Sequence, residues 1–256
     1  MAIKNLIPIA KKAGIISLDY WGKKTRVWKN ENGESETYVN SEVDNFLKKE
    51  IALLWPEYGI QTRGGEQINN DSDYQWLVAL NGTKNFVGQN PNVQVQVALM
   101  FREETVLGLI YNPISEQLFY ALKGKGAYLD GKKIVLRESP LMGDAIIDID
   151  TGNLQNLNDS NPVNKNWIKE KIIELIGESK RIRMSGGMTS IYLVTGAINA
   201  YVVFNTGIKP YHLATRIIIM EEAGYSARIV KLSNEKMAVI VAGEPLLSEI
   251  EKIILQ

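Results

Sequence analysis

The chain has 256 residues, 45% of them hydrophobic, which is enough for one large domain or two closely packed halves. Lysine plus arginine and aspartate plus glutamate both number 29, and this balance argues against a non-specific nucleic-acid binder. The absence of cysteine excludes disulfides and thiolate metal sites. Apolar runs stay well short of the roughly 20 residues of a membrane span, and the first residues lack a signal-peptide core, so we expect a soluble cytoplasmic protein with no membrane contact.

The N-terminal residues predict two amphipathic helices. Apolar residues at a spacing near 3.6 predict the first over 3–21, with Pro8 in its first turn. Ser41 with Asp44 three residues later resembles a capping box, and it predicts the start of a second helix that ends before Pro56.

The remaining elements follow from alternation, turn residues and periodicity. In the first half, strands are predicted at 26–28, 37–39, 76–80, 93–97, 105–111 and 117–122, the first two forming a hairpin around Asn32-Gly33. In the second half, strands are predicted at 145–149, 181–184, 199–204 and 238–242, and helices at 166–176, 190–195, 211–223 and 245–255. Thr151–Val163 is interpreted as a loop. We expect an N-terminal α+β half (1–142) and a C-terminal α/β half (143–256) in one compact unit.

The stretch Gly65–Val87 is the main candidate for a functional site. It begins with the lone acid Glu66, continues through a polar loop, and then forms a short buried strand that ends in Asn81-Gly82-Thr83. Gly82 allows the backbone to turn, and the Thr83 hydroxyl with free amides beside it could meet an anion. The alternative interpretation is a plain β-turn between two strands of a sheet.

This stretch resembles the signature of the inositol monophosphatase family, G-E-E, a spacer, then W-(I/V)-(I/V)-D-P-(I/L)-D-G-T-x-N-F. Glu66, Gly82 and Thr83 match it in place. Both aspartates, which in the family hold catalytic magnesium ions, are replaced. The second is Asn81, and the first is Val78 or a gap, depending on where the alignment is anchored.

A second resemblance lies at Gly207–Gly224, which matches G-(I/L)-x-x-W-D-x-A followed by E-A-G. His212, the single histidine of the chain, occupies the metal-binding Asp position. Neutral imidazole binds zinc or manganese well but magnesium poorly. The alternative is that His212 is a partly buried structural residue. Asn205 occupies the position of the acidic residue that contacts substrate hydroxyls in the family.

A third match, Arg183–Met188, resembles R-x-x-G-(S/T)-A-A, whose backbone amides approach the substrate in the family. Gly187 and Met188 fall within this segment, and Met188 places a long apolar side chain where a small one is usual. The substrate-binding residues that the resemblance implies are therefore Gly82, Thr83, Gly187, Met188 and Asn205.

The resemblance implies an α+β fold, the layered αβαβα sandwich of sugar phosphatases, and a homodimer in the cytoplasm. It implies Mg²⁺ as the cofactor, with Glu66, Leu80, Asn81 and His212 at the ligand positions and Glu66 and Thr83 as the catalytic residues that orient water. Three lost carboxylates predict weak magnesium binding.

Two functions therefore compete. The first is a pseudo-phosphatase that binds a small phosphorylated ligand or a protein partner, for which extragenic-suppressor members of the family, acting through partners in RNA metabolism, are a precedent. The alternative is an active metal-dependent phosphatase for inositol phosphate or a related phosphomonoester.

Overall fold

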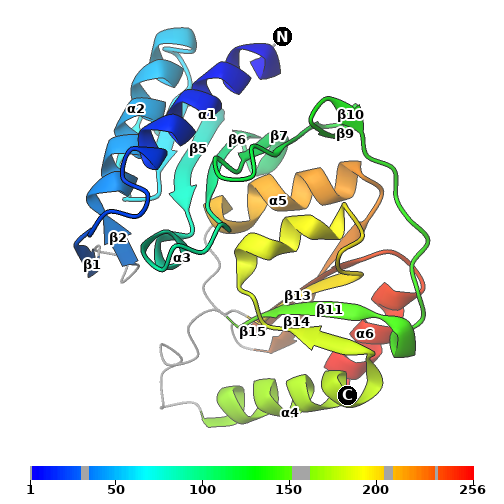
Figure 1. Ribbon diagram of the computed structural model, residues 1–256. Coiled ribbons are helices and arrows are strands. Elements are labelled where there is room, and N and C mark those ends of the chain that lie inside the picture. The colour runs from blue at the N-terminus through cyan, green and yellow to red at the C-terminus, as the bar shows by residue number, and fades with distance from the viewer. Residues whose placement is uncertain (1, 30–34, 152–161, 205–209, 234–235) are drawn as a thin grey trace. The chain divides into compact units, whose positions relative to one another are not determined.

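The computed structural model describes residues 2–29, 35–151, 162–204, 210–233 and 236–256, which divide into two compact units (Figure 1). Unit 1 consists of Met1–Lys133 and Pro210–Ile219, and unit 2 of Ile134–Lys209 and Met220–Gln256. The expected division into 1–142 and 143–256 stays a prediction. Within the described ranges, no helix combines the length and apolar character needed to cross a membrane.

The sheet of unit 1 has eight strands. They are β3 (Gly59–Thr62), β4 (Gln67–Ile68), β5 (Tyr74–Asn81), β6 (Gln94–Phe101), β7 (Glu104–Tyr111), β8 (Leu118–Leu122), β9 (Gly126–Leu129) and β10 (Lys132–Lys133). Their order is β10-β9-β8-β7-β6-β5-β3-β4, and every neighbouring pair is antiparallel except β3 with β5. The four strands that the sequence predicts here are confirmed, although β5 and β6 are longer than expected.

Two helices that pack against each other, α1 (Ala2–Leu18) and α2 (Tyr38–Leu54), cover one face of this sheet (Figure 1). In α2, every fourth residue from Val39 to Ile51 is buried, so a single apolar stripe faces the strands. Beneath it lie alternate residues of β5, namely Trp76, Val78 and Leu80. Both helices were predicted, but Pro8 lies inside α1 rather than in its first turn.

The start of α2 corrects the sequence prediction. The helix begins at Tyr38, and its capping box is formed by Thr37 and Asn40, whose Oδ1 accepts from Thr37 N at 2.9 Å and from Thr37 Oγ1 at 2.7 Å. The box predicted from Ser41 and Asp44 was wrong because Asp44 is buried and accepts a hydrogen bond from a distant strand.

A short ribbon precedes α2. Its strands, β1 (Val27–Lys29) and β2 (Ser35–Thr37), pair antiparallel as the expected hairpin does, although the Asn32-Gly33 turn lies outside the described residues. The second strand predicted at 37–39 was wrong beyond Thr37, because the capping box at Thr37 makes Tyr38 and Val39 the first residues of α2. On the other face of the large sheet lies the part of α5 (Pro210–Glu222) that belongs to unit 1. Gly108 allows this approach, since a Cβ there would lie 2.6 Å from Ile218 Cγ2 and 2.8 Å from the Thr215 carbonyl oxygen.

Unit 2 contains a five-stranded mixed sheet. Its strands are β11 (Ile146–Asp150), β12 (Arg181–Arg183), β13 (Ala200–Phe204), β14 (Ser226–Ser233) and β15 (Lys236–Ala242), in the order β12-β11-β13-β15-β14. The strand β11 runs parallel to β12 and β13, whereas β15 is antiparallel to β13 and β14. Four of these strands were predicted from the sequence; β14 was missed.

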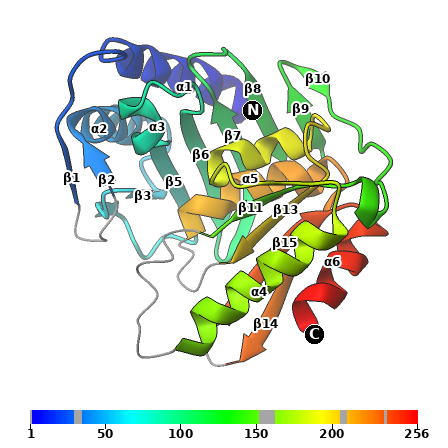
Figure 2. The ribbon, with the colours of Figure 1, turned by 60° about the horizontal axis from the view of Figure 1, so that its bottom comes forward.

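Helices α4 (Pro162–Glu178) and α6 (Leu246–Leu255) pack against one face of this sheet, α4 lying beside α6 (Figure 2). The 3-10 helices η1 (Met142–Asp144) and η3 (Gly187–Leu193) complete the described elements of unit 2, η3 replacing the α-helix predicted at 190–195. Of the loop predicted at Thr151–Val163, residues 152–161 lie outside the described part, and α4 already begins at Pro162.

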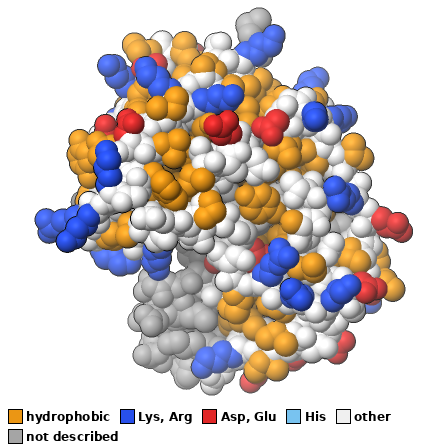
Figure 3. Space-filling view, in the orientation of Figure 1, with side chains coloured by type: hydrophobic (Ala, Val, Ile, Leu, Met, Phe, Trp, Pro, Cys, Tyr) orange, Lys and Arg blue, Asp and Glu red, His pale blue; other side chains and the backbone are white. Residues whose placement is uncertain are grey.

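On the face shown in Figure 3, positive and negative side chains are interspersed with hydrophobic ones.

Candidate functional site

The strand β5 runs without a break through the signature stretch. Its pairing with β6 is one-to-one from Tyr74 opposite Phe101 to Asn81 opposite Gln94. Successive side chains of a strand point to opposite faces, so positions 78 and 81 cannot share a face. Val78 is fully buried in the core under α1 and α2, whereas the Asn81 amide donates to Gln96 Oε1 at 2.9 Å.

The turn after β5 requires glycine. Gly82 has a φ of 93°, in the left-handed region, and a Cβ there would lie 2.7 Å from the Asn92 carbonyl oxygen. The short helix α3 (Thr83–Val87) follows directly, and Thr83 is 5% exposed. The predicted turn at Gly82 is therefore present, with Thr83 buried beside it.

Two side chains of α2 bind the backbone of Leu80. Asn40 Nδ2 donates to the Leu80 carbonyl oxygen at 2.8 Å, and Leu80 N donates to Asp44 Oδ1 at 3.1 Å. Neighbouring strand β3 pairs with β5 only as far as Thr62 opposite Val78, so it cannot supply these bonds. Residues four apart on a helix share a face, which lets Asn40 and Asp44 take its place.

Burial raises the pKa of Asp44 to about 7, because the charged form of a carboxylate is disfavoured away from water. The hydrogen bond from Leu80 N and the positive charge of Arg63 act in the opposite direction. The charges of Glu36 and Glu66 raise this pKa further. Two acids and Arg63 thus act electrostatically on Asp44 at the end of β5.

Thr83 is held by a buried arginine. Arg63 Nη1 donates to Thr83 Oγ1 at 2.8 Å, and Asn40 Nδ2 lies 3.1 Å from the same oxygen. Arg63 Nη2 also donates to the Ser35 carbonyl oxygen at 3.1 Å, and the residue is 9% exposed. Arg63 comes directly after β3, where its backbone N donates to the Val78 carbonyl oxygen at 3.2 Å. The guanidinium is therefore fixed beside the signature turn.

The candidate catalytic acid Glu66 forms an ion pair with Lys48 of α2. Its side chain is 60% exposed, whereas that of Lys48 is 23% exposed. A solvent-exposed ion pair of this kind contributes at most about 1 kcal/mol and can exchange partners. Glu66 is therefore accessible, but its carboxylate already has a cation.

Unit 2 holds the third matching segment, Arg183–Met188, in place through Asp148. This fully buried carboxylate of β11 accepts from Ser185 N at 3.2 Å and from Thr189 Oγ1 at 2.5 Å. Between these contacts, Gly187 and Met188 form the first turn of η3. Burial raises the pKa of Asp148, against the lowering effect of the bonds from Thr189 and Ser185. Asp148 therefore fixes the segment that carries the predicted substrate-binding residues.

Two predicted site residues cannot be placed. Asn205 lies outside the described residues, and His212 lies in α5 with its side chain outside the described part. Among the described residues, helix α2 contacts three of the predicted site residues: Asn40 binds Leu80 and Thr83, and Lys48 binds Glu66. Gly187 and Met188 belong to unit 2. No group of three His, Asp or Glu side chains that could hold a metal occurs in the described part of the chain.

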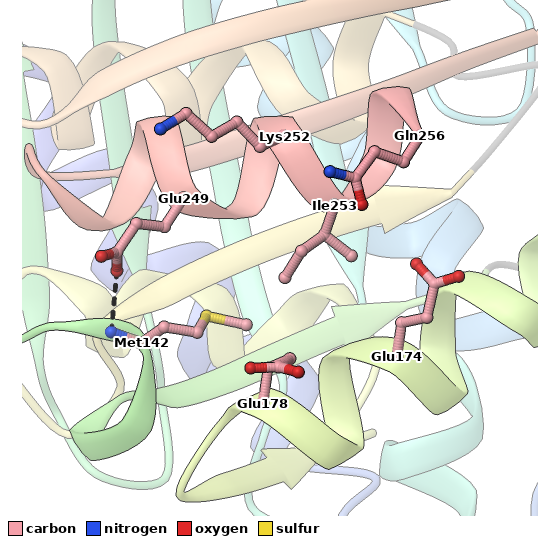
Figure 4. A pocket seen from close by; sticks show the side chains of 7 residues that line it. All are labelled: Met142, Glu174, Glu178, Glu249, Lys252, Ile253 and Gln256. Atoms are coloured by element: carbon pink, nitrogen blue, oxygen red, sulfur yellow. Dashed lines mark hydrogen bonds between the residues drawn. The ribbon is translucent and has the colours of Figure 1, made fainter.

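A separate pocket of about 400 Å³ lies in unit 2 (Figure 4). Carboxylates of both helices line it, with Glu174 and Glu178 from α4 and Glu249 from α6. Glu249 Oε2 is used internally, since it accepts from Met142 N at 2.8 Å. The residues predicted from the sequence do not line this pocket, which remains a structural feature without an assigned ligand.

Comparison with known proteins identifies the fold and the family. The model of the inositol monophosphatase family matches residues 2–251. The chain belongs to this family. A Nus factor SuhB from Salmonella typhimurium is 26% identical over 225 residues, covering 84% of this chain and 80% of that protein.

A fructose-1,6-bisphosphatase/inositol-1-monophosphatase from Thermotoga maritima is also 26% identical, over 223 residues, with 85% and 80% covered. The extragenic suppressor protein suhB from Bartonella henselae has the same fold, with a TM-score of 0.87 at 21% identity, covering 99% of this chain and 98% of that one. The predicted α+β fold of inositol monophosphatases is thereby confirmed.

Sequence reasoning missed the residues that surround the signature. Asn40, Asp44 and Arg63 converge on Leu80 and Thr83 from more than fifteen positions away. One signal was present, because Asn40 and Asp44, four residues apart, lie directly beside the apolar stripe of α2, and polar residues at such positions indicate a buried polar contact. The pattern did not reveal what they would contact.

Proposed function

We propose that this chain is a pseudo-phosphatase of the inositol monophosphatase family, which binds a phosphorylated ligand or a protein partner without hydrolysing phosphomonoesters. The observation that supports this most is the state of the signature groups. The Leu80 carbonyl oxygen, Thr83 Oγ1 and the Glu66 carboxylate all accept from donors of the chain itself.

The chemistry of magnesium supports the same proposal. Magnesium prefers an octahedral set of oxygens with carboxylates among them. Of the implied ligand positions, Asn81 is neutral and its amide is bonded to Gln96, while Val78 lies in the apolar core. Glu66 is the one carboxylate, so these residues as they stand do not fit a magnesium site.

When bound in a phosphatase, such a metal activates water and steadies the leaving oxygen. Loss of one such electrostatic stabiliser commonly costs about a hundredfold in rate. Thr83 is held in a fixed orientation, since Arg63 and Asn40 bind its hydroxyl. Binding without turnover is the function that these residues support best.

The names of the relatives support both candidate functions, one relative for each. The resemblance to proteins named Nus factor SuhB supports a role through a protein partner. The resemblance to the fructose-1,6-bisphosphatase/inositol-1-monophosphatase of Thermotoga maritima supports the alternative, an active phosphatase for inositol phosphate or a related phosphomonoester. The exposed, exchangeable Glu66–Lys48 pair also leaves the alternative open. Homodimer formation and a cytoplasmic location belong to this proposal as well.

Phosphate release decides between the two. We would assay inositol 1-phosphate and p-nitrophenyl phosphate with magnesium, manganese and zinc, beside the Thermotoga relative as a positive control. The proposal expects turnover at least about a hundredfold below that control with every metal. Robust magnesium-dependent release by the wild-type chain would instead establish the phosphatase. In parallel, a thermal shift on adding inositol 1-phosphate without metal would measure ligand binding.

A further inference from the structure

Three donors converge on the end of β5 from two directions. Lys48 and Asn40 come from α2, and Arg63 follows β3. Between them they reach the Glu66 carboxylate, the Leu80 carbonyl oxygen and the Thr83 hydroxyl. The Glu66 carboxylate and the Leu80 carbonyl oxygen are at ligand positions that the family resemblance implies, and Thr83 is at the implied water-orienting position.

We propose that Lys48, Arg63 and Asn40 are a built-in replacement for a divalent cation, so that the signature region of unit 1 is complete without metal. The inference rests on the proposed function, which it deepens by naming what stands in the place of the cation. Asn40 and Arg63 form its buried part and Lys48 its exchangeable part.

The buried part is fixed by several bonds to each group. Arg63 donates to Thr83 Oγ1 and to the Ser35 carbonyl oxygen, and its planar fork suits two acceptors at once. Asn40 uses both ends of its amide, accepting from Thr37 and donating to Leu80 and Thr83. Because a buried guanidinium is costly without acceptors, this arrangement needs each partner to be present.

Charge balance points to the same conclusion. Two further acids, Glu36 and Glu66, act electrostatically on Asp44 at this site. Arg63 stabilises the charged form of Asp44, and Lys48 pairs with Glu66. Two side-chain cations thus offset much of the negative charge that would otherwise attract a metal ion.

Lys48 is the exchangeable member. Its pair with Glu66 is partly exposed, so a divalent cation has to compete with the ammonium for this carboxylate. Lys49, the next residue on α2, is exposed and provides a matched control for removing one positive charge from the helix. Arg102, whose side chain is 69% exposed, serves the same purpose for Arg63.

Thermal unfolding of the full chain tests the proposal in buffers of equal ionic strength, with about 10 mM magnesium or manganese chloride or with chelator. For the wild type we expect the cation to shift Tm by less than about 1 °C. Lys48→Met should gain a cation-dependent rise of about 2 °C or more that Lys49→Met lacks, because Glu66 becomes available.

For the buried part, Arg63→Met should lower Tm by about 5 °C or more, whereas Arg102→Met should leave it within about 1 °C. Arg63→Lys keeps the positive charge but loses the two-pronged guanidinium, so its Tm should lie between those of Arg63→Met and Arg102→Met. If Arg63→Met does not fold, Arg63→Lys is measured in its place. A wild-type Tm that rises with magnesium as much as that of Lys48→Met would overturn the proposal. Equal Tm values for Arg63→Met and Arg102→Met would also overturn it.

The same samples are assayed for phosphate release, which separates this inference from the proposed function. If the wild type hydrolyses phosphomonoesters and its Tm is insensitive to the cation, the proposal of a pseudo-phosphatase is wrong, but the proposal that internal donors replace the cation stands. If the wild type is inactive but magnesium raises its Tm, the proposal that internal donors replace the cation is wrong, and the proposal of a pseudo-phosphatase stands.

Discussion

The side-chain amide of Asn40 lies 2.8 Å from the carbonyl oxygen of Leu80, forty residues further along the chain. This bond fixes α2 to the end of β5 at the point where β3 no longer pairs with it. The same residue closes the capping box of α2 through Thr37. One buried amide therefore links the start of a helix to the end of a central strand.

Asn40→Ala should lower the free energy of unfolding by about 2–4 kcal/mol, because it leaves the Leu80 carbonyl and the Thr37 amide without these partners. Asn45 lies on the same helix but is exposed, so Asn45→Ala should change stability by less than about 0.5 kcal/mol. Urea unfolding of the two variants gives the comparison. Equal losses for the two variants would show that the buried bonds of Asn40 do not determine the effect, since the change from asparagine to alanine itself favours the helix.

Val78→Asp should destabilise the protein by about 3 kcal/mol or more, since the side chain at this position lies in the apolar core under α1 and α2. Val78→Ala separates the loss of packing from the burial of charge and should cost less. Urea unfolding at pH 7 and at pH 4 makes the comparison. The excess cost of aspartate should shrink at pH 4, where the carboxyl is more easily neutral, and an excess that does not change with pH would contradict this account.

Asp148 predicts a specific pH dependence of stability. Burial raises its native pKa above the ordinary value of about 3.8, so the native state holds the proton more tightly than the unfolded state. The stabilisation from this group is complete below about pH 4 and is lost as the pH rises through the native pKa. Its neighbours Ser185 and Thr189 lower the pKa, and the charge of Asp150 raises it.

Asp148→Asn removes the titration and can still accept from Ser185. The variant should therefore gain stability relative to the wild type as the pH rises from about 4 to 8. Urea midpoints across this range measure the difference, with Asp71→Asn, at an exposed position, as the control. A constant difference between wild type and Asp148→Asn would contradict the assignment.

Gly108→Ala should cost about 1–3 kcal/mol, because the added methyl group would overlap the Thr215 carbonyl oxygen and Ile218 of α5. A methyl group added at Gly143 would meet no atom within 4 Å beyond its chain neighbours, so Gly143→Ala should be neutral within about 0.5 kcal/mol. Thermal and urea unfolding of both variants test this. If Gly108→Ala were as stable as the wild type, α5 would not be held by this close contact.

The sequence by itself determined the order of the main elements and the family. The four-residue spacing of apolar residues in α2 reflects one-sided burial, which leaves a periodic record along the chain. The strict alternation in β6 marks the apolar face of the strand, although both faces are buried and Gln94 and Gln96 are each 1% exposed. Gly82 was identifiable because its turn requires a backbone that other residues rarely adopt. These features depend on near neighbours, so a single sequence contains them.

The tertiary structure alone decided which atoms meet at the end of β5. Asn40, Arg63 and Lys48 read in the sequence as ordinary polar residues of a helix and a loop, and the capping box was assigned to Ser41 and Asp44. The partners of Asn40, Arg63 and Lys48, namely Leu80, Thr83 and Glu66, lie 18 to 43 residues further along the chain. Periodicity records which face of an element is buried but not which distant group is opposite. That pairing is determined only when the strand and the helix pack together, since the free backbone edge of Leu80 exists only where β3 ends.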